Sequence, residues 1–148
     1  MTNELNPMDK FNFLLGRWKL KYKVPNSLFG DEDEGEGTGE FKRILNDKYV
    51  TFDYSAKLQA GEGSAHAIFV WDEKAKIYRY WWFEDSGSFM TASCNFIDED
   101  TLCLNWHDSL LVQTFKRENA NRIVLKMKYP SGDNSYDLIL EVTFIRIN

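Results

Sequence analysis

Few side chains in this sequence have the types and spacing that chemistry requires. Two imidazoles, His66 and His107, could each act as an acid, a base or a ligand near neutral pH. No Ser-His-Asp, Cys-His or metal-ligand spacing accompanies them, and a lone His more often has a structural role. We keep both as candidate ligand-binding residues and assign no catalytic residue.

Arg43 is the most interesting charged residue in the sequence. It shares a strand face with Phe41 and Leu45, whereas Glu40 and Lys42 share the other face. On an inner face, Arg43 could bind a carboxylate or a phosphate through two parallel hydrogen bonds. A slip of one residue near the preceding glycines would turn the side chain outward, and the sequence leaves both orientations open.

Aromatic side chains that carry a hydroxyl or an indole group could line a pocket for a small molecule. The bulky candidates are Tyr22, Phe52, Tyr54, Tyr80, Trp82 and Tyr129. Three of them, Tyr54, Tyr80 and Trp82, join Arg43, His66 and His107 as predicted ligand-binding residues. The alternative interpretation is that these aromatic residues form an ordinary core.

The acidic residues do not form a recognisable site. Glu84 and Asp85 are adjacent, so on an extended strand their carboxylates point to opposite faces. The acidic run from Asp31 to Glu36 lacks the glycine that an EF-hand calcium loop needs at its sixth position. We therefore expect no bound metal and no cofactor.

The elements that position these residues are mainly strands. Trp18, Leu20, Tyr22 and Val24 alternate with basic residues, which is the period of two expected for a strand with one buried face. A short helix over Asp9–Leu15 precedes this strand, with Asp9 as the expected N-cap and Gly16 as the expected C-cap. Three glycines at the start of the next strand predict a bulge or a sharp bend.

About ten strands follow from the whole pattern. Short turns join them and no helical crossover intervenes, which is typical of an up-and-down antiparallel sheet. So many strands in 148 residues should close into a barrel, because closure removes exposed edges. We predict an all-β fold, a single antiparallel barrel domain over residues 1–148.

Charge and hydropathy exclude several classes of partner. The net charge of −5 and the pI near 5.1 argue against nucleic acid and against an anionic membrane, since both need a basic face. Met1–Lys10 lacks the features of a signal peptide, and no apolar run is long enough to span a membrane. These features predict a cytoplasmic protein.

Two cysteines flank a predicted turn. With the turn centred on Asp98 and Glu99, Cys94 and Cys103 would lie directly opposite each other. A bridge is geometrically conceivable, but in the cytoplasm we expect two free buried thiols.

The order of elements resembles the calycin superfamily. The resemblance rests on the short helix, the Gly16-Arg17-Trp18 segment on the first strand, the meander of strands and Arg146 in the last strand. In lipocalins the Trp of this segment packs at the closed end of the barrel beneath an Arg from the last strand. The resemblance implies that Arg146 packs on Trp18 and that any ligand site lies at the opposite mouth.

A narrower resemblance is to bacterial lipocalin-like proteins described as a domain of unknown function. It covers Phe13 to Trp18, Gly37 to Phe41, Val70-Trp71-Asp72 with Tyr78, and Trp82 to Ser86. Nitrobindin-type haem barrels are a more distant possibility. They carry a His ligand, whereas neither His of this chain lies in the C-terminal strands, so haem is a minority interpretation.

These observations favour a barrel that binds a small, mostly apolar or amphipathic molecule. In one version of this hypothesis the ligand carries an acidic head group that faces Arg43. An enzyme with His66 or His107 in the cavity is an alternative. A structural barrel is another, including a homodimer through outward aromatics, since Trp71, Trp81 and Phe83 alternate with Tyr80 and Trp82.

Overall fold

The computed structural model describes residues 5–148 and consists of one short helix and ten strands. The helix, η1, is a 3₁₀ helix over Pro7–Leu14. The strands are β1 (Gly16–Val24), β2 (Asp33–Ile44), β3 (Tyr49–Leu58), β4 (Gly61–Asp72), β5 (Ile77–Glu84), β6 (Phe89–Asp98), β7 (Thr101–Trp106), β8 (Val112–Asn119), β9 (Arg122–Gly132) and β10 (Ser135–Arg146).

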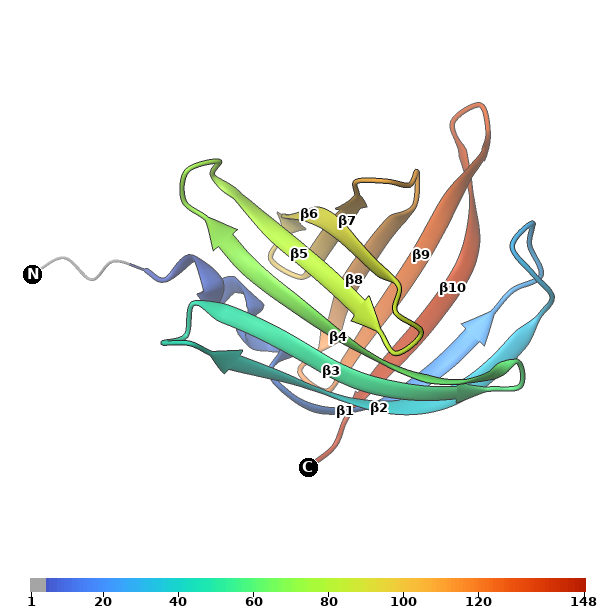
Figure 1. Ribbon diagram of the computed structural model, residues 1–148, viewed down its shortest axis with the longest axis horizontal. Coiled ribbons are helices and arrows are strands. Elements are labelled where there is room, and N and C mark those ends of the chain that lie inside the picture. Colours follow the sequence, from blue (N-terminus) through green and yellow to red (C-terminus); the bar gives the residue numbers. More distant parts are fainter. Residues whose placement is uncertain (1–4) are drawn as a thin grey trace, which may run out of the picture.

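The ten strands form one closed antiparallel barrel. Each strand pairs with the next along the chain, and β10 closes the sheet against β1 (Figure 1). Closure leaves no unpaired edge between the first and last strands. The all-β up-and-down barrel predicted from the alternation of residues is thereby confirmed.

The alternation in β1 explains how the barrel gains its core. Trp18 and Leu20 are fully buried, while the intervening Arg17, Lys19 and Lys21 are exposed. Burying one apolar face of each strand while solvating the other is the main driving force for closure. This strand therefore has an inner and an outer face, as predicted.

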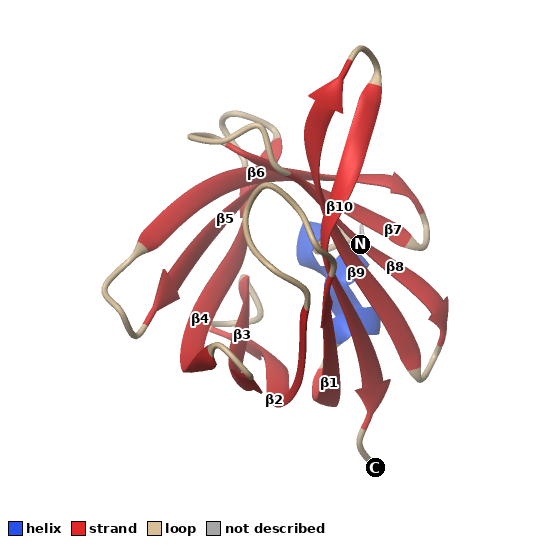
Figure 2. Ribbon diagram, turned by 90° about the vertical axis from the view of Figure 1, so that its right-hand side faces the viewer, coloured by secondary structure: helices blue, strands red, loops and turns tan. Residues whose placement is uncertain are grey.

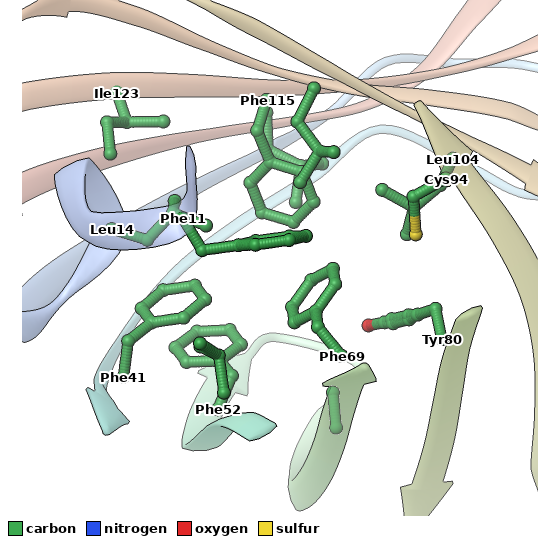
Figure 3. Packing of buried hydrophobic residues seen from close by; sticks show 14 of the residues in the cluster. Phe11, Leu14, Phe41, Phe52, Phe69, Tyr80, Cys94, Leu104, Phe115 and Ile123 are labelled. Carbon is green, nitrogen blue, oxygen red and sulfur yellow. The ribbon is translucent and has the colours of Figure 1, made fainter. Parts of the chain in front are cut away.

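The helix η1 fills one end of the barrel. Its buried side chains are Met8, Phe11 and Leu14, and Figure 3 shows Phe11 extending from the helix between Phe69 and Phe115. The Phe11 ring lies 4.9 Å from Phe69, centroid to centroid. The helix thus closes this end with apolar packing.

The caps of η1 differ from the prediction. Asn6 is the N-cap, because its side chain accepts a hydrogen bond from the Met8 amide, and Pro7 sets the first helical residue. Asp9 lies inside the first turn instead, and Leu15 is the C-cap. Gly16 begins β1 with φ +118°, and a Cβ there would lie 2.7 Å from Nη1 of Arg146, so glycine is required.

The glycines of β2 allow close approach of strands. Pairing with β3 runs unbroken from Gly35 to Ile44, so no bulge forms between these strands. A Cβ at Gly39 would lie 2.5 Å from the Phe52 ring. The absent side chain leaves room for the stacked pair of Phe41 and Phe52, whose centroids are 4.0 Å apart. Leu45, predicted to extend this face, lies exposed in the turn with φ 50°.

The cysteines are not opposite each other, contrary to the prediction. A register shift between Phe96 and Asp98 moves the pairing by one residue, so Cys103 pairs with Asn95 and Cys94 pairs with Leu104. Neighbouring positions along a strand face opposite sides, which separates the two sulfurs. Both thiols are free and buried, and burial raises the pKa of each.

The barrel interior has two halves. The half at η1 is filled by the core cluster seen in Figure 3. The opposite mouth faces the viewer in Figure 2, with the helix behind and the β1–β2 connection across the opening.

Within residues 5–148 no helix has the length and apolar character needed to cross a membrane.

Candidate functional site: a cavity at the open end of the barrel

A cavity of about 310 Å³ occupies the barrel on the side away from η1. This volume is at the lower end of the range for small-molecule sites. Phe52, Phe115 and Phe144 are among the lining residues that also belong to the buried core. The other lining residues are Tyr22, Tyr54, Tyr80, Trp82, Met90, Trp106, Leu111, Gln113, Leu125, Met127, Leu140 and Val142.

Three predicted ligand-binding residues, Tyr54, Tyr80 and Trp82, line this cavity. The indole Nε1 of Trp82 donates a hydrogen bond to the Tyr54 hydroxyl at 2.8 Å, which leaves the hydroxyl proton of Tyr54 free to be donated. Burial raises the pKa of Tyr54, Tyr80 and Tyr22 above the ordinary tyrosine value, so all three phenols are neutral near pH 7.

Two polar groups in the lining have no hydrogen-bond partner among the described residues. They are Nε1 of Trp106, which can only donate, and Oε1 of Gln113, which can only accept. Trp106 is 8% exposed and Gln113 is 4% exposed. A buried polar group without a partner is unfavourable and unusual, so both atoms are suited to a bound molecule.

Sequence reasoning missed Gln113 and Trp106. A signal for Gln113 was present, because it lies between Leu111 and Phe115 in a series that alternates with outward residues. A polar residue at an inward position of a strand is the kind of exception that marks a site. Trp106 has no such signal, because a large aromatic residue on a strand is typical of an ordinary core.

Charge is missing from the cavity wall. Among the lining residues in the described part of the chain there is no Arg, Lys, Asp, Glu or His. An ionised group inside would lose hydration without gaining a countercharge, which strongly disfavours it. The cavity chemistry is therefore aromatic, apolar and neutral, with a few hydrogen-bonding groups.

The Arg43 side chain lies on the inner face of its strand, at the end of the barrel that η1 closes and outside this cavity. Its Nη1 donates to Oδ1 of Asp9 at 2.8 Å and to Oδ1 of Asn12 at 2.9 Å, and Nη2 donates to the Asp47 carbonyl at 2.8 Å. Its side chain is 14% exposed. The guanidinium thus holds η1 and the β2–β3 turn together.

His66 lies on the outer surface of the barrel. Its Nδ1 is 2.5 Å from Oδ1 of Asp53 on the neighbouring strand, and its side chain is 42% exposed. Together with Ser64 and Asp85 it lines an open groove over β1 to β5. Ser64 is itself bound to Asp85, since its hydroxyl donates to Oδ2 at 3.2 Å.

His107 lies in the turn after β7 and is exposed. Its Nδ1 is 2.8 Å from the Thr91 hydroxyl, and its amide donates to the Thr91 carbonyl. Neither imidazole therefore reaches the cavity. Residues 5–148 also contain no cluster of three His, Cys, Asp or Glu side chains that could hold a metal.

Trp18 and Arg146 meet at the closed end. The guanidinium carbon of Arg146 lies 4.2 Å from the centroid of the Trp18 ring. The Trp18 Nε1 donates to the Leu14 carbonyl at 2.7 Å, which ties the ring to the helix. These contacts place the stacked Arg and buried Trp that the resemblance implies beneath η1 and away from the cavity.

The aromatic residues of β4 and β5 divide differently from the prediction. Trp71 shares the inner face with Tyr78, whose ring is 4.7 Å away, and does not belong with the outward set. Phe83 is on the outer face and 42% exposed. Tyr129, predicted to line a pocket, instead packs on Phe29 of the β1–β2 connection at 4.9 Å.

Solved structures with a similar fold match most of this chain at low sequence identity. Rv2717c from M. tuberculosis matches with a TM-score of 0.70 at 11% identity, over 98% of this chain and 100% of that chain. The S-type phycobiliprotein lyase CPES from Guillardia theta matches with a TM-score of 0.68 at 9% identity, over 98% and 94%. A de novo designed fluorescence-activating β-barrel matches with a TM-score of 0.52 at 10% identity, over 94% and 98%.

At these identities the likeness concerns the fold alone. No family model matches the chain, and neither does any curated protein sequence.

Proposed function

We propose that this protein binds a small, mostly apolar molecule in the cavity at the open end of the barrel. The observation that carries the proposal is the cavity itself, about 310 Å³ enclosed by aromatic and aliphatic side chains with a few polar groups. Such a combination is typical of small-molecule sites, because apolar walls supply affinity and sparse polar groups fix orientation.

The names of two structural neighbours agree with this function. One is a phycobiliprotein lyase and another is a fluorescence-activating barrel. Both names suit a barrel that accommodates a small molecule, although fold likeness alone does not carry a ligand across. The support for binding in this chain therefore comes from its own cavity.

The positions of the imidazoles weigh against the two other candidates. A cavity enzyme and a His-ligated haem both need His66 or His107 inside the barrel, and both side chains lie outside the cavity. The residues present in the cavity wall do not fit a His-ligated haem. We derive no step through a cofactor.

Membership of the bacterial lipocalin-like family of unknown function is also part of the proposal. It is supported by the contact of Trp71 with Tyr78, since both residues lie within the segments that carry this resemblance. The contact of Arg146 with Trp18 supports the broader calycin resemblance. The nitrobindin relationship lacks this kind of support.

The proposal is tested with N-phenyl-1-naphthylamine, an uncharged dye whose fluorescence rises in apolar surroundings. We expect the wild-type protein to bind it with saturation. Met127→Trp fills the cavity and should weaken binding at least about tenfold, because the added ring occupies the ligand volume.

The matched control is Lys128→Trp, which adds the same ring at the next position of β9 on the exposed outer face. It should leave the affinity unchanged. Absence of saturable binding to the wild type, or equal weakening by both variants, would overturn the proposal.

A further inference from the structure

We infer that the cavity selects an uncharged aromatic ring system that carries a hydrogen-bond donor next to an acceptor, of the cyclic-amide type. This inference rests on the proposed function and specifies its ligand class. It is carried by the juxtaposition of Trp106 and Gln113, two side chains of one apolar cavity wall whose Nε1 and Oε1 atoms are unpaired and complementary.

The barrel register brings the two side chains to one patch of wall. Leu104 of β7 pairs with Gln113 of β8, and Trp106 is two residues further along β7 on the same face. Diagonal neighbours of this kind lie roughly 7–8 Å apart, within reach of long and aromatic side chains. The register therefore places both side chains on one patch of the cavity wall.

Neither group satisfies the other. Nε1 of Trp106 has one proton to donate, and Oε1 of Gln113 has lone pairs to offer, yet each is without a partner among residues 5–148. A ligand must present an acceptor to Trp106 and a donor to Gln113. A secondary amide within a ring offers both, side by side and in one plane.

The rest of the wall sets the remaining properties of the ligand. Aromatic rings from Tyr80, Trp82 and Trp106 favour a flat partner through offset or edge-to-face contacts. The described lining has no charged side chain, so a carboxylate or an ammonium group would be buried without compensation. The ligand class is therefore neutral, flat and mostly apolar.

The volume limits the size. At about 30 Å³ for each water molecule, 310 Å³ corresponds to roughly ten waters. A two-ring compound is of this order, so we choose three bicyclic probes. They are 2-quinolinone, which has the adjacent N–H and C=O, naphthalene, which has neither, and 2-naphthoate, which has a charge.

The experiment measures displacement of N-phenyl-1-naphthylamine by each probe from the wild type and from Gln113→Met and Trp106→Phe. Gln113→Met removes the amide and keeps a side chain of similar shape, whereas Trp106→Phe removes the indole N–H and keeps a smaller aromatic ring. We expect each variant to lower the affinity for 2-quinolinone about tenfold. The affinity for naphthalene should change less than about twofold, because only 2-quinolinone loses a buried hydrogen bond.

Thr114→Met makes the same replacement at the adjacent outward position of β8 and should change neither affinity. We expect 2-naphthoate to compete at least about tenfold more weakly than naphthalene, since it brings an unpaired charge.

Equal effects of Gln113→Met on 2-quinolinone and naphthalene, or effective competition by 2-naphthoate, would overturn this inference while leaving the binding function standing. Failure of the dye to bind the wild type would overturn the binding function itself. The two failures are therefore distinguishable.

Discussion

The guanidinium of Arg146 stacks on the indole of Trp18, 4.2 Å from ring centroid to guanidinium carbon. The same group donates to the carbonyls of Leu15 at 2.6 Å, Phe13 at 3.2 Å and Ala120 at 2.9 Å. One side chain near the chain end thus joins β10, β1, η1 and the β8–β9 turn. It seals the end of the barrel opposite the cavity.

Replacing this guanidinium should lower stability without affecting binding. Arg146→Lys keeps the charge but loses the planar stack and the set of directed hydrogen bonds, and we expect it to reduce the free energy of unfolding by about 2–3 kcal/mol. Urea denaturation measures this loss. The affinity for N-phenyl-1-naphthylamine should stay within about twofold of wild type, and a large loss of binding by folded protein would contradict the assignment of the two ends.

Arg43 provides a second test that the closed end of the barrel contributes to stability and not to binding. Arg43→Met removes the hydrogen bonds to Asp9 and Asn12 that hold η1, so we expect the protein to lose about 1–3 kcal/mol of stability. Binding of the uncharged dye should not change. If Arg43→Met lowered the affinity for a carboxylate ligand alone, the result would instead support the predicted role of Arg43 in binding an acidic head group.

Replacing Gln113 should raise stability, in contrast to replacing Arg146 or Arg43. Its unpaired Oε1 is buried at a position that an apolar side chain could fill, so Gln113→Met should raise the melting temperature of the ligand-free protein by a few degrees, about 1 kcal/mol. Differential scanning calorimetry tests this. A fall in melting temperature would mean that the amide is already well satisfied.

The buried tyrosines set how stability depends on pH. Burial raises the pKa of Tyr22, Tyr54 and Tyr80 above the ordinary 10.0, so the folded protein favours the neutral phenols. Stability is therefore fully present below about pH 10 and is lost as the pH rises further, because unfolding then releases protons.

With no His in the described cavity wall, the affinity for the uncharged dye should be flat between about pH 6 and pH 9. Fluorescence titrations across this range check the prediction. An inflection within this range that disappears in His66→Gln would show that an imidazole takes part after all.

The strands could be predicted from the sequence because their residues alternate with period two, as in β1. The same parity allowed an inward Arg43, but a possible slip near the glycines left its orientation open. What parity does not fix is position along the barrel axis, and the salt bridge with Asp9 depends on where η1 enters the interior. Register shifts are equally invisible, so the predicted pairing of Cys94 with Cys103 was wrong by one residue.

The candidate site was predictable only in part. Tyr54, Tyr80 and Trp82 were identified because large aromatic side chains on an inward face are the usual walls of a pocket. His66 and His107 drew attention for their chemistry, but strand parity and turn position put both outside the cavity. Gln113 carries neither a charge nor an aromatic ring, so its only signal is its inward position in an apolar series.

The central claim is that a small uncharged molecule binds inside the open half of the barrel. The five tryptophans report on this directly, since each has one indole N–H signal in a ¹H–¹⁵N correlation spectrum. Trp82 and Trp106 line the cavity, whereas Trp18 is buried at the closed end and Trp71 donates to Glu73 beside the β4–β5 turn.

On addition of N-phenyl-1-naphthylamine, with signals assigned by single Trp→Phe variants, we predict that the Trp82 and Trp106 signals shift with saturation. The Trp18 and Trp71 signals should stay in place. Saturable shifts confined to Trp18, Trp71 or Trp81, with Trp82 and Trp106 unmoved, would contradict a ligand site in the cavity.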